Sequence, residues 1–502
     1  MYSSLRIAVL SIVIVNVLSI QSTSAQSGIT GQDATQPIAL HPDNQHYFIY
    51  RGEPRLLITS AEHYGAVLNL DFDYETYLET MQQEGMNYTR IFVGSYVEIP
   101  GSFGIGNNTL APAVGRFIAP WQRTNEKGLY EGEKKFDLDA WNPDYFERLN
   151  NFIREADQRD IIVEVTFFCS TYADDSWQRN PFNPSNNVND IPQIDRKKSN
   201  TLANGLLTNY QKKLVAKIVT ELNTFNNIFY EIQNEPWSDD PQNALRTLKT
   251  LDPEGLGWAK WAHSASEASL EWQQVMVDHI IATEQRLNKK HLIAQNYTNF
   301  KHSLESVKEG VDIINFHYAW PEAVWMNYAW DRPISFDESG FAGSSDTTYL
   351  RQAWQFVVAG GSVFNNLDYS FYVGHEDGRG NNDAPGGGSA TLRQQLGYLC
   401  EFMESLDYLR MRPDFSTIVH APGVETQCLA EVGRQYAVFL TGRSTDWVKL
   451  NLPQGNFIYE FVSPFTGEAI DTGDISGSDE TIQLELPEFE RMVALRIIRS
   501  AR

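Results

Sequence analysis

Short runs of β-branched and aromatic residues alternate along most of the chain with longer segments of helical periodicity. Eight such runs, each a predicted strand, lie at 56–61, 88–93, 161–168, 228–233, 291–295, 312–316, 333–336 and 362–367. The predicted helices between them include 74–83, 143–158, 206–223, 261–288 and 348–359. Eight repeats of a strand followed by a helix predict the α/β class and a closed parallel (β/α)8 barrel, the TIM barrel.

An open, doubly wound sheet is the alternative for this pattern, but its first strand usually leads into a glycine-rich phosphate-binding turn. Here the first strand leads into Ser60-Ala61-Glu62-His63-Tyr64-Gly65, which is not such a turn. The barrel therefore explains the pattern better. The fifth and sixth units are its weakest, and the short distance from 319 to 333 predicts a short or irregular sixth helix.

Three long insertions follow the second, third and fourth predicted strands, at 100–135, 170–200 and 238–260. They are rich in Gly, Pro, Asn and Trp. In a barrel, the loops that follow the strands all lie on the face that carries the active site. The insertions therefore indicate a cleft on that face.

The pattern changes after a last predicted helix at 392–406. Short alternating runs follow at 436–440, 448–452, 457–462, 482–486 and 493–498, with Pro and Gly turns between them. They are typical of an antiparallel β-sandwich of about ninety residues. We place the boundary near Leu409, which gives a barrel domain at 26–408 and a β-sandwich accessory domain at 409–502.

The first residues follow the pattern of a secretory signal. Arg6 precedes an apolar run at 7–18, and small residues follow at 23–25. We predict a cleaved signal peptide at 1–25, with an uncleaved membrane anchor as the alternative. No later stretch reaches ~18 consecutive apolar residues, so we expect a secreted protein, extracellular or periplasmic, with no membrane partner.

Composition narrows the function further. The chain holds 40 Lys and Arg against 64 Asp and Glu, and its formal net charge of −24 disfavours nucleic acid. Its 12 Trp, 23 Tyr and 27 Phe suit a core but also stacking on a neutral ligand such as a sugar. Cys169, Cys400 and Cys428 are too scattered for a disulfide framework or a zinc site, and we interpret them as buried structural residues.

The strongest chemical signal ends the fourth predicted strand, where Asn234, Glu235, Pro236 and Trp237 follow one another. The proline stops the strand and fixes the backbone that carries the carboxylate. Alone, Glu235 could be an ordinary loop residue, but Glu338 ends the seventh predicted strand in the same way. Two carboxylates at one barrel mouth suit glycosidic cleavage, in which one protonates the leaving oxygen and the other attacks the anomeric carbon.

This chemistry requires different protonation states in the two carboxyl groups. The acid needs a pKa raised by burial and by its negative partner, whereas the nucleophile must stay ionised through hydrogen bonds from nearby donors. Arg90, near the end of the second strand, and Tyr318, near the end of the sixth, are candidate donors.

Together these strand ends resemble those of the retaining glycoside hydrolases of clan A, and most of all the cellulase and mannanase type called family five. That family ends strand two in Arg, strand four in Asn-Glu-Pro, strand six in a His and Tyr pair, and strand seven in Glu. The resemblance covers roughly 38–406 and implies that Glu235 is the acid/base and Glu338 the nucleophile. It also implies supporting or substrate-binding roles for Arg90, Asn234, His317 and Tyr318.

Two features depart from the family pattern. His317 and Tyr318 are adjacent, so on a regular strand they would point to opposite faces unless the strand has already ended. The Trp that the family often presents after strand eight is missing, and Tyr369 or Phe371 is the candidate substitute.

The turn at 463–468 resembles one in barrel hydrolases that carry a C-terminal β-sandwich.

Several other residues are candidates for the site. His63 ends the first strand and is either a substrate contact or a core residue. The glycine-rich stretch 374–389 offers oxygen ligands for calcium, but its spacing fits no EF-hand, and we favour a loop without metal. Six tryptophans fall in predicted loops on the active face, where two or three would stack on sugar rings: Trp121, Trp177, Trp237, Trp320, Trp325 and Trp330.

The sequence thus predicts a secreted retaining glycosidase that acts on a β-linked polysaccharide or oligosaccharide without a metal or organic cofactor. A catalytically silent carbohydrate-binding or adhesion protein on the same barrel is the rival. The long loops are compatible both with a pocket for exo attack and with an extended groove for a polymer.

Overall fold

The computed structural model describes residues 35–246, 261–381, 383–443, 447–478 and 480–500. The signal peptide predicted at 1–25 lies outside these ranges. None of the helices within them is both long enough and apolar enough to cross a membrane.

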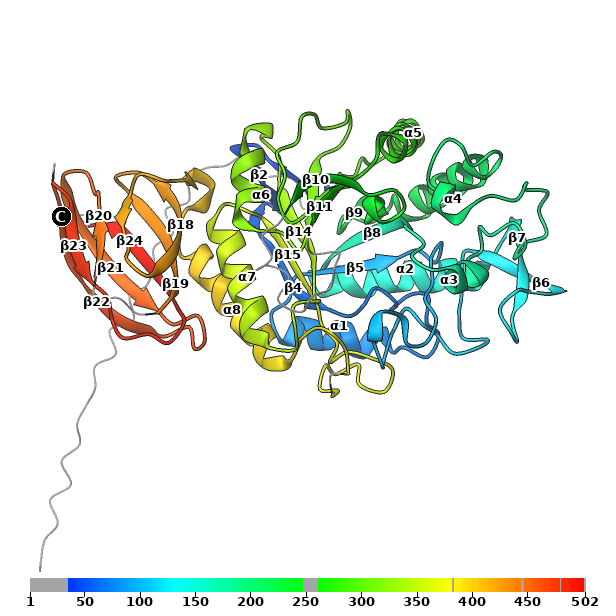
Figure 1. Cartoon of the computed structure of the whole chain (residues 1–502), viewed down its shortest axis with the longest axis horizontal. Coiled ribbons are helices and arrows are strands. Elements are labelled where there is room, and N and C mark those ends of the chain that lie inside the picture. Colours follow the sequence, from blue (N-terminus) through cyan, green and yellow to red (C-terminus); the bar gives the residue numbers. More distant parts are fainter. Residues whose placement is uncertain (1–34, 247–260, 382, 444–446, 479, 501–502) are drawn as a thin grey trace, which may run out of the picture.

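Eight parallel strands form the central sheet, in the order β4-β15-β14-β13-β12-β9-β8-β5, which confirms the predicted barrel (Figure 1). Between β5 and β4, the side-chain amide of Asn87 donates to the Leu56 carbonyl at 2.7 Å and accepts from the Ile58 N–H at 3.0 Å. The strands are β4 (Leu57–Ala61), β5 (Tyr88–Phe92), β8 (Ile162–Cys169), β9 (Ile228–Asn234), β12 (Ile293–Asn299), β13 (Ile313–His317), β14 (Ile334–Ser339) and β15 (Val363–Leu367).

The helices cover the outside of this sheet. In α2, the Asn142 side chain accepts from the Asp144 N–H, and Pro143 takes the first helical position, where it is readily accommodated. Its buried residues, such as Leu149 and Phe152, recur at helical spacing and form the face turned to the strands. The helices are α1 (Tyr74–Gln83), α2 (Pro143–Gln158), α3 (Asp174–Arg179), α4 (Leu207–Leu222), α5 (Glu267–Glu284), α6 (Pro321–Asn327), α7 (Asp346–Val358) and α8 (Ala390–Glu404).

Two parts of the predicted repeat were wrong. The helix predicted at 261–288 begins later, because Trp261–Ser264 forms strand β11, which pairs antiparallel with β10 (Gln242–Arg246). The fifth unit has no helix, since residues 300–312 between β12 and β13 form turns and irregular backbone. The sixth helix, α6, is short as expected.

A small antiparallel sheet closes the barrel at the amino ends of its strands. It consists of β1 (Ala39–His41), β2 (Asn44–Tyr50) and β3 (Glu53–Arg55). Phe48 and Tyr50 of β2 belong to one buried cluster with residues near the starts of the barrel strands, such as Leu57, Tyr88 and Ile162. The carboxyl ends of the strands therefore remain as the face on which a site can form.

The insertions carry their own structure. An antiparallel hairpin of β6 (Trp121–Lys127) and β7 (Lys134–Trp141) lies within and after the first insertion, and α3 lies within the second. Short 3-10 turns occur at η1 (Ser102–Gly104), η2 (Arg196–Lys198), η3 (Pro236–Ser238), η6 (Tyr328–Trp330) and η7 (Tyr408–Arg410).

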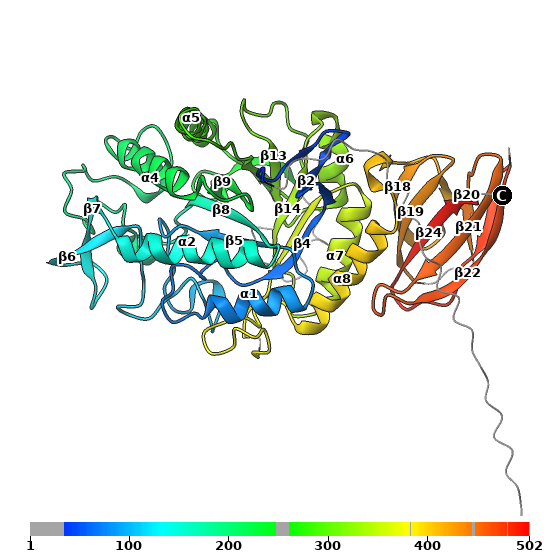
Figure 2. The same cartoon turned by 180° about the vertical axis from the view of Figure 1, so that it is seen from behind.

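The C-terminal part is antiparallel, with a six-stranded sheet ordered β16-β18-β19-β24-β21-β22 and a three-stranded sheet ordered β17-β20-β23. Helices α7 and α8 lie between this part and the barrel strands (Figures 1 and 2), and Trp354 of α7 stacks on Phe439 of β19 at 5.4 Å. The strands are β16 (Arg412–Pro413), β17 (Ile418–His420), β18 (Val424–Glu431), β19 (Gln435–Gly442), β20 (Trp447–Leu450), β21 (Gly455–Val462), β22 (Ala469–Gly477), β23 (Ile482–Glu485) and β24 (Met492–Arg499).

Candidate active site

Glu235 and Glu338 meet at the carboxyl ends of β9 and β14. One carboxylate oxygen of each lies within 4.8 Å of the other and of a ring nitrogen of His317. Glu235 has a left-handed backbone (φ 47°) just before Pro236, which turns the chain out of the strand. Its N–H donates to Asn296 Oδ1 at 3.3 Å, so neighbouring strands fix the position of this strained residue.

Glu338 is surrounded by hydrogen-bond donors. The hydroxyls of Tyr318 and Tyr64 donate to its two oxygens at 2.7 Å and 2.9 Å, and Arg90 Nη1 donates at 3.4 Å. Burial would raise the pKa of Glu338, but the positive charges of His317 and Arg90 and the Tyr318 hydroxyl outweigh it and lower that pKa. The Glu338 carboxyl is therefore held in its ionised form.

Tyr318 reaches Glu338 although it follows His317 directly. Strand β13 ends at His317, and Tyr318 adopts a left-handed backbone with φ 51°. This conformation breaks the alternation of a regular strand, so Tyr318 reaches Glu338 although His317 contacts both glutamates. Although they are adjacent in the sequence, His317 and Tyr318 therefore both face the site.

Glu235 has different partners from Glu338. One of its oxygens accepts from the Tyr172 hydroxyl at 2.8 Å and lies 3.4 Å from Ser238 Oγ, while the other lies 3.1 Å from His317 Nδ1. Burial opposes the protonation of His317, yet the charges on Glu338 and Asp337 raise its pKa well above the usual value. A positively charged imidazole therefore lies between the two carboxyl groups.

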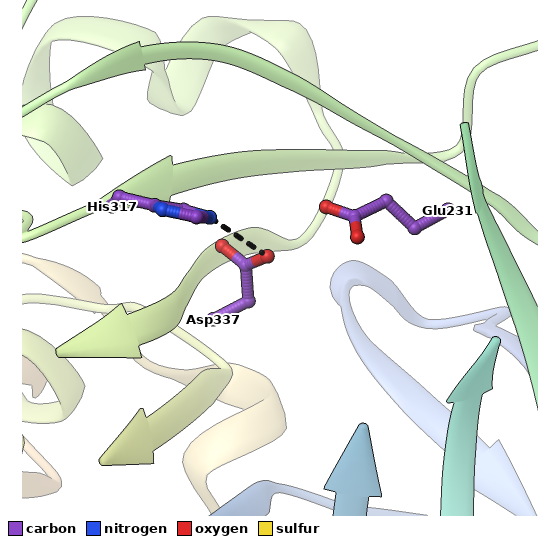
Figure 3. A group of neighbouring side chains, drawn as sticks. All are labelled: Glu231, His317 and Asp337. Carbon is purple, nitrogen blue, oxygen red and sulfur yellow. Dashed lines mark ion pairs between the residues drawn. The ribbon is translucent and has the colours of Figure 1, made fainter. Parts of the chain in front are cut away.

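A layer of buried charges supports the site from below. Figure 3 shows Glu231 and Asp337 directed toward the ring of His317, whose Nε2 lies 3.5 Å from Asp337 Oδ2. Arg90, which is completely buried, donates to Glu231 and to Asn234 Oδ1 and lies 3.5 Å from Asp337. Glu231, His317 and Asp337 have the types and spacing of metal ligands, but Arg90 already supplies the positive charge among them. We therefore interpret this group as an ion-pair network rather than a metal site.

A cavity of about 340 Å³ opens above the two glutamates. Four of the other residues predicted for the site line it: His63, Asn234, Trp237 and Tyr318. Arg90 and His317 lie below it, completely buried, and contact the glutamates. Trp320 is not among the lining residues, because its ring packs against Phe300 and Lys301.

Several other aromatic candidates pack in the core or on the C-terminal part. Trp121 is buried in the core against Phe182, and Trp325 lies in α6 with its ring against Phe415 of the C-terminal part, so neither is available at the mouth. Phe371 is also buried, with its ring under the Arg393 guanidinium, away from the cavity. Tyr369 lies closer, within ring contact of His63.

The remaining sequence interpretations concern cysteines and calcium. Cys400 and Cys428 do not line the cavity. Cys169 does, and its Sγ accepts a hydrogen bond from Asn234 Nδ2 at 3.4 Å. Within the described part of 374–389, the Asp377 carboxylate accepts from the Arg379 N–H. The two metal-like clusters found among the described residues do not include this loop.

Sequence reasoning missed several residues of the site. Tyr64 follows His63 at the end of β4, and Glu231 and Asp337 lie within strands whose alternation could have marked them as charges pointing inward. Tyr172 and Glu98 lie in loops after β8 and β5. The sequence placed the loops after these strands on the active face, but no pattern singled out these two side chains.

Comparisons with known proteins concern the fold. A family 5 glycoside hydrolase from Bacteroides vulgatus superposes with a TM-score of 0.60 at 13% identity, over 93% of this chain and 94% of that chain. The chain has the fold of a family 5 glycoside hydrolase. A second protein from the same organism, provisionally assigned as a glycoside hydrolase, gives a TM-score of 0.63 at 12% identity over 94% of this chain and 83% of that one.

A third solved glycoside hydrolase gives a TM-score of 0.56 at 10% identity, over 93% of this chain and 98% of that chain. The likeness thus extends beyond the barrel into the C-terminal sheets. No family model matches the sequence, and no curated protein matches it.

Proposed function

We propose that the protein is a secreted retaining glycosidase that hydrolyses β-linked oligosaccharides or polysaccharides. The observation that carries the proposal is the pair Glu235 and Glu338, whose oxygens approach within 4.8 Å in different environments. Retaining enzymes hold their carboxyl groups at about 5–5.5 Å, whereas inverting enzymes separate them by about 6.5–9.5 Å to admit a water molecule. Secretion rests on the signal sequence at 1–25.

In the first step, Glu338 attacks the anomeric carbon and Glu235 gives its proton to the departing glycosidic oxygen. The carbon–oxygen bond breaks, and the sugar is held as an ester on Glu338. In the second step, Glu235 takes a proton from water, which attacks the same carbon and releases the sugar with its original configuration. The low pKa of Glu338 suits both a nucleophile and a leaving group.

The surrounding residues fit supporting roles in these steps. Arg90 and Tyr318 stabilise the ionised Glu338, and Asn234, held by Arg90, borders the place where the 2-hydroxyl would lie. Trp237, with its ring 5.3 Å from that of His317, offers an apolar surface for a sugar face.

A silent carbohydrate-binding protein would not need this arrangement. Pure binding does not require one carboxylate to be kept ionised beside a second that aims at the same point. Burying two carboxyl groups side by side also costs free energy. The geometry therefore favours the enzyme over the binder.

The experiment is a screen of aryl β-glycosides and β-linked polysaccharides with the natural chain and three variants. Glu338→Gln should abolish turnover while binding remains, and Glu235→Ala should retain activity toward good leaving groups and be rescued by azide. Glu131→Gln, a change at an exposed glutamate, is the matched control. Ordinary activity of Glu338→Gln would overturn the assignment.

A further inference from the structure

The two proposed catalytic carboxyl groups have different neighbours in the cavity. Tyr64, which donates to Glu338, follows His63 directly, whereas Ser238 lies near Glu235. Glu235 protonates the departing oxygen, so the leaving part of the substrate lies on the Ser238 side. The sugar that becomes attached to Glu338 must therefore lie on the His63 side.

That side ends at a buried pair of polar residues. His63 Nε2 lies 3.3 Å from Glu98 Oε1, and the two residues are 7% and 2% exposed. Asn108 donates to the other oxygen of Glu98 at 2.5 Å, which fixes the carboxylate. His63 Nδ1 is buried and has no hydrogen-bond partner among the described residues, although His63 lines the cavity.

The loop after β5 packs against the loop after β4 beside this pair. The Thr109 hydroxyl donates to the His63 carbonyl at 3.0 Å, and the Thr109 carbonyl accepts from Asn69 Nδ2 at 3.0 Å. A side chain at Gly65 would place its Cβ 2.2 Å from the Thr109 oxygen, so the two loops are in direct contact. Further along, the Gly106 N–H donates to the Asp383 carbonyl at 2.7 Å and joins the loops after β5 and β15.

Phe103 extends from the same loop over the cavity. Its ring packs edge-on against Tyr172 at 5.1 Å and against Phe341 at 6.2 Å, residues that follow β8 and β14. All three line the cavity. These rings and the packed loops thus border the cavity that holds His63 and Glu98.

We propose that His63 and Glu98 bind the hydroxyls of one terminal sugar, so that the enzyme removes single units from the non-reducing end of its substrate. A carboxylate accepts hydrogen bonds from two hydroxyls, and the free ring nitrogen of His63 supplies a further partner. As a hydrogen-bond acceptor, Glu98 suits the hydroxyls of neutral sugars. The proposal rests on the proposed glycosidase function and extends it.

The test uses the purified full chain with aryl β-glycosides of single neutral sugars and with β-1,4-linked mannohexaose, xylohexaose and cellohexaose. Products are separated early in the reaction, before secondary cuts accumulate. We expect cleavage of at least one aryl monoglycoside and, from the matching hexaose, a monosaccharide and a pentasaccharide. Early disaccharides and trisaccharides without monosaccharide would overturn exo attack but leave the glycosidase assignment intact.

A second measurement tests the two residues themselves. Glu98→Gln should lower kcat/KM for the aryl monoglycoside by about ten- to hundredfold, because hydrogen bonds to a charged group are lost. Glu131→Gln, a change at an exposed residue of the insertion 100–135, should leave kcat/KM unchanged. An unchanged kcat/KM in Glu98→Gln would overturn the assigned subsite. Absence of any hydrolysis that depends on Glu338 would overturn the glycosidase function and this inference together.

Discussion

His317 lies between the two proposed catalytic carboxyl groups and serves both. Its Nδ1 is 3.1 Å from Glu235 and 3.4 Å from Glu338, and its Nε2 faces Asp337. Asp337 in turn has a lowered pKa, since His317 and Arg90 outweigh the effect of its burial. A single positive ring thus links the ionisation of the nucleophile to the charges below it.

Replacing His317 by Gln should move the acid limb of the pH profile. Activity needs ionised Glu338, so it is present above the pKa of that group and lost as the pH falls through it. Without the His317 charge this pKa rises, and the limb should shift upward by about 1–3 pH units. The measurement is kcat/KM against pH.

His302→Gln, a change at a half-buried histidine outside the site, is the control for this shift. An acid limb that stays in place in His317→Gln would contradict the role given to the imidazole.

At the scale of elements, the ends of β8 and β9 form one hydrogen-bonded unit around Asp239. Ser170 Oγ lies 2.7 Å from the Glu235 carbonyl oxygen and 3.0 Å from Asp239 Oδ2. Burial raises the pKa of Asp239 to about 7. The turn that holds Glu235 is thus packed against a carboxyl group that resists ionisation.

Asp239→Asn should flatten the dependence of stability on pH. The folded state binds the Asp239 proton more tightly than the unfolded state, so the free energy of unfolding falls as the pH rises from about 4 to 7, by up to about 4 kcal/mol. Asp239→Asn has no carboxyl group to ionise at this position, so its free energy of unfolding does not fall for this reason. Thermal unfolding at pH 5 and pH 8 should show a smaller difference in Tm for Asp239→Asn than for the natural chain, with Asp240→Asn, an exposed neighbour, as the control. Equal differences in all three proteins would refute this reading.

The order of elements followed from local patterns, but several details did not. The predicted bounds of α1 and α2 match the structure because their buried faces and caps are local. Strand β11 was mistaken for the start of α5, because its pairing with β10 is set by the fold and not by its own residues. For the same reason, the sequence did not predict that Glu98 and Tyr172 lie at the site, because their loops are positioned by contacts distant in sequence.

The candidate site was predictable as far as it lies on strand ends. Asn234, Glu235 and Glu338 come together because the carboxyl ends of parallel strands share one face. The role of Tyr318 depends on its left-handed backbone, which no pattern in the sequence predicted. The sequence did not show which of the six tryptophans would pack instead of reaching the mouth; Trp121 packs because it lies in the hairpin of β6 and β7.

At the scale of the whole molecule, the C-terminal sheet shares its core with the barrel. Leu429, Ala437 and Phe439 belong to the same buried cluster as residues of α7 and α8. Gln435 exchanges hydrogen bonds with the backbone of Asp407 at 3.0 Å each. We therefore expect this part to stabilise the barrel.

Phe439→Ala should destabilise the whole chain, by about 3–5 kcal/mol, because it leaves a cavity beside Trp354. Calorimetry should show one unfolding transition that moves down as a unit, with loss of activity at the same temperature. Phe415→Ala, at a ring that is 69% exposed, should have a much smaller effect. A barrel transition that keeps its Tm while a separate C-terminal transition falls would show independent domains instead.

Covalent trapping tests the assignment of Glu338 most directly. Aryl 2-deoxy-2-fluoro-β-glycosides with good leaving groups form the ester with a retaining nucleophile and slow its hydrolysis, so the adduct accumulates. With the sugar that the screen identifies, mass spectrometry of the digested protein should find one fluorosugar on the peptide that contains Glu338. An adduct on another residue, or none on a protein that cleaves the matching substrate, would contradict the proposed mechanism.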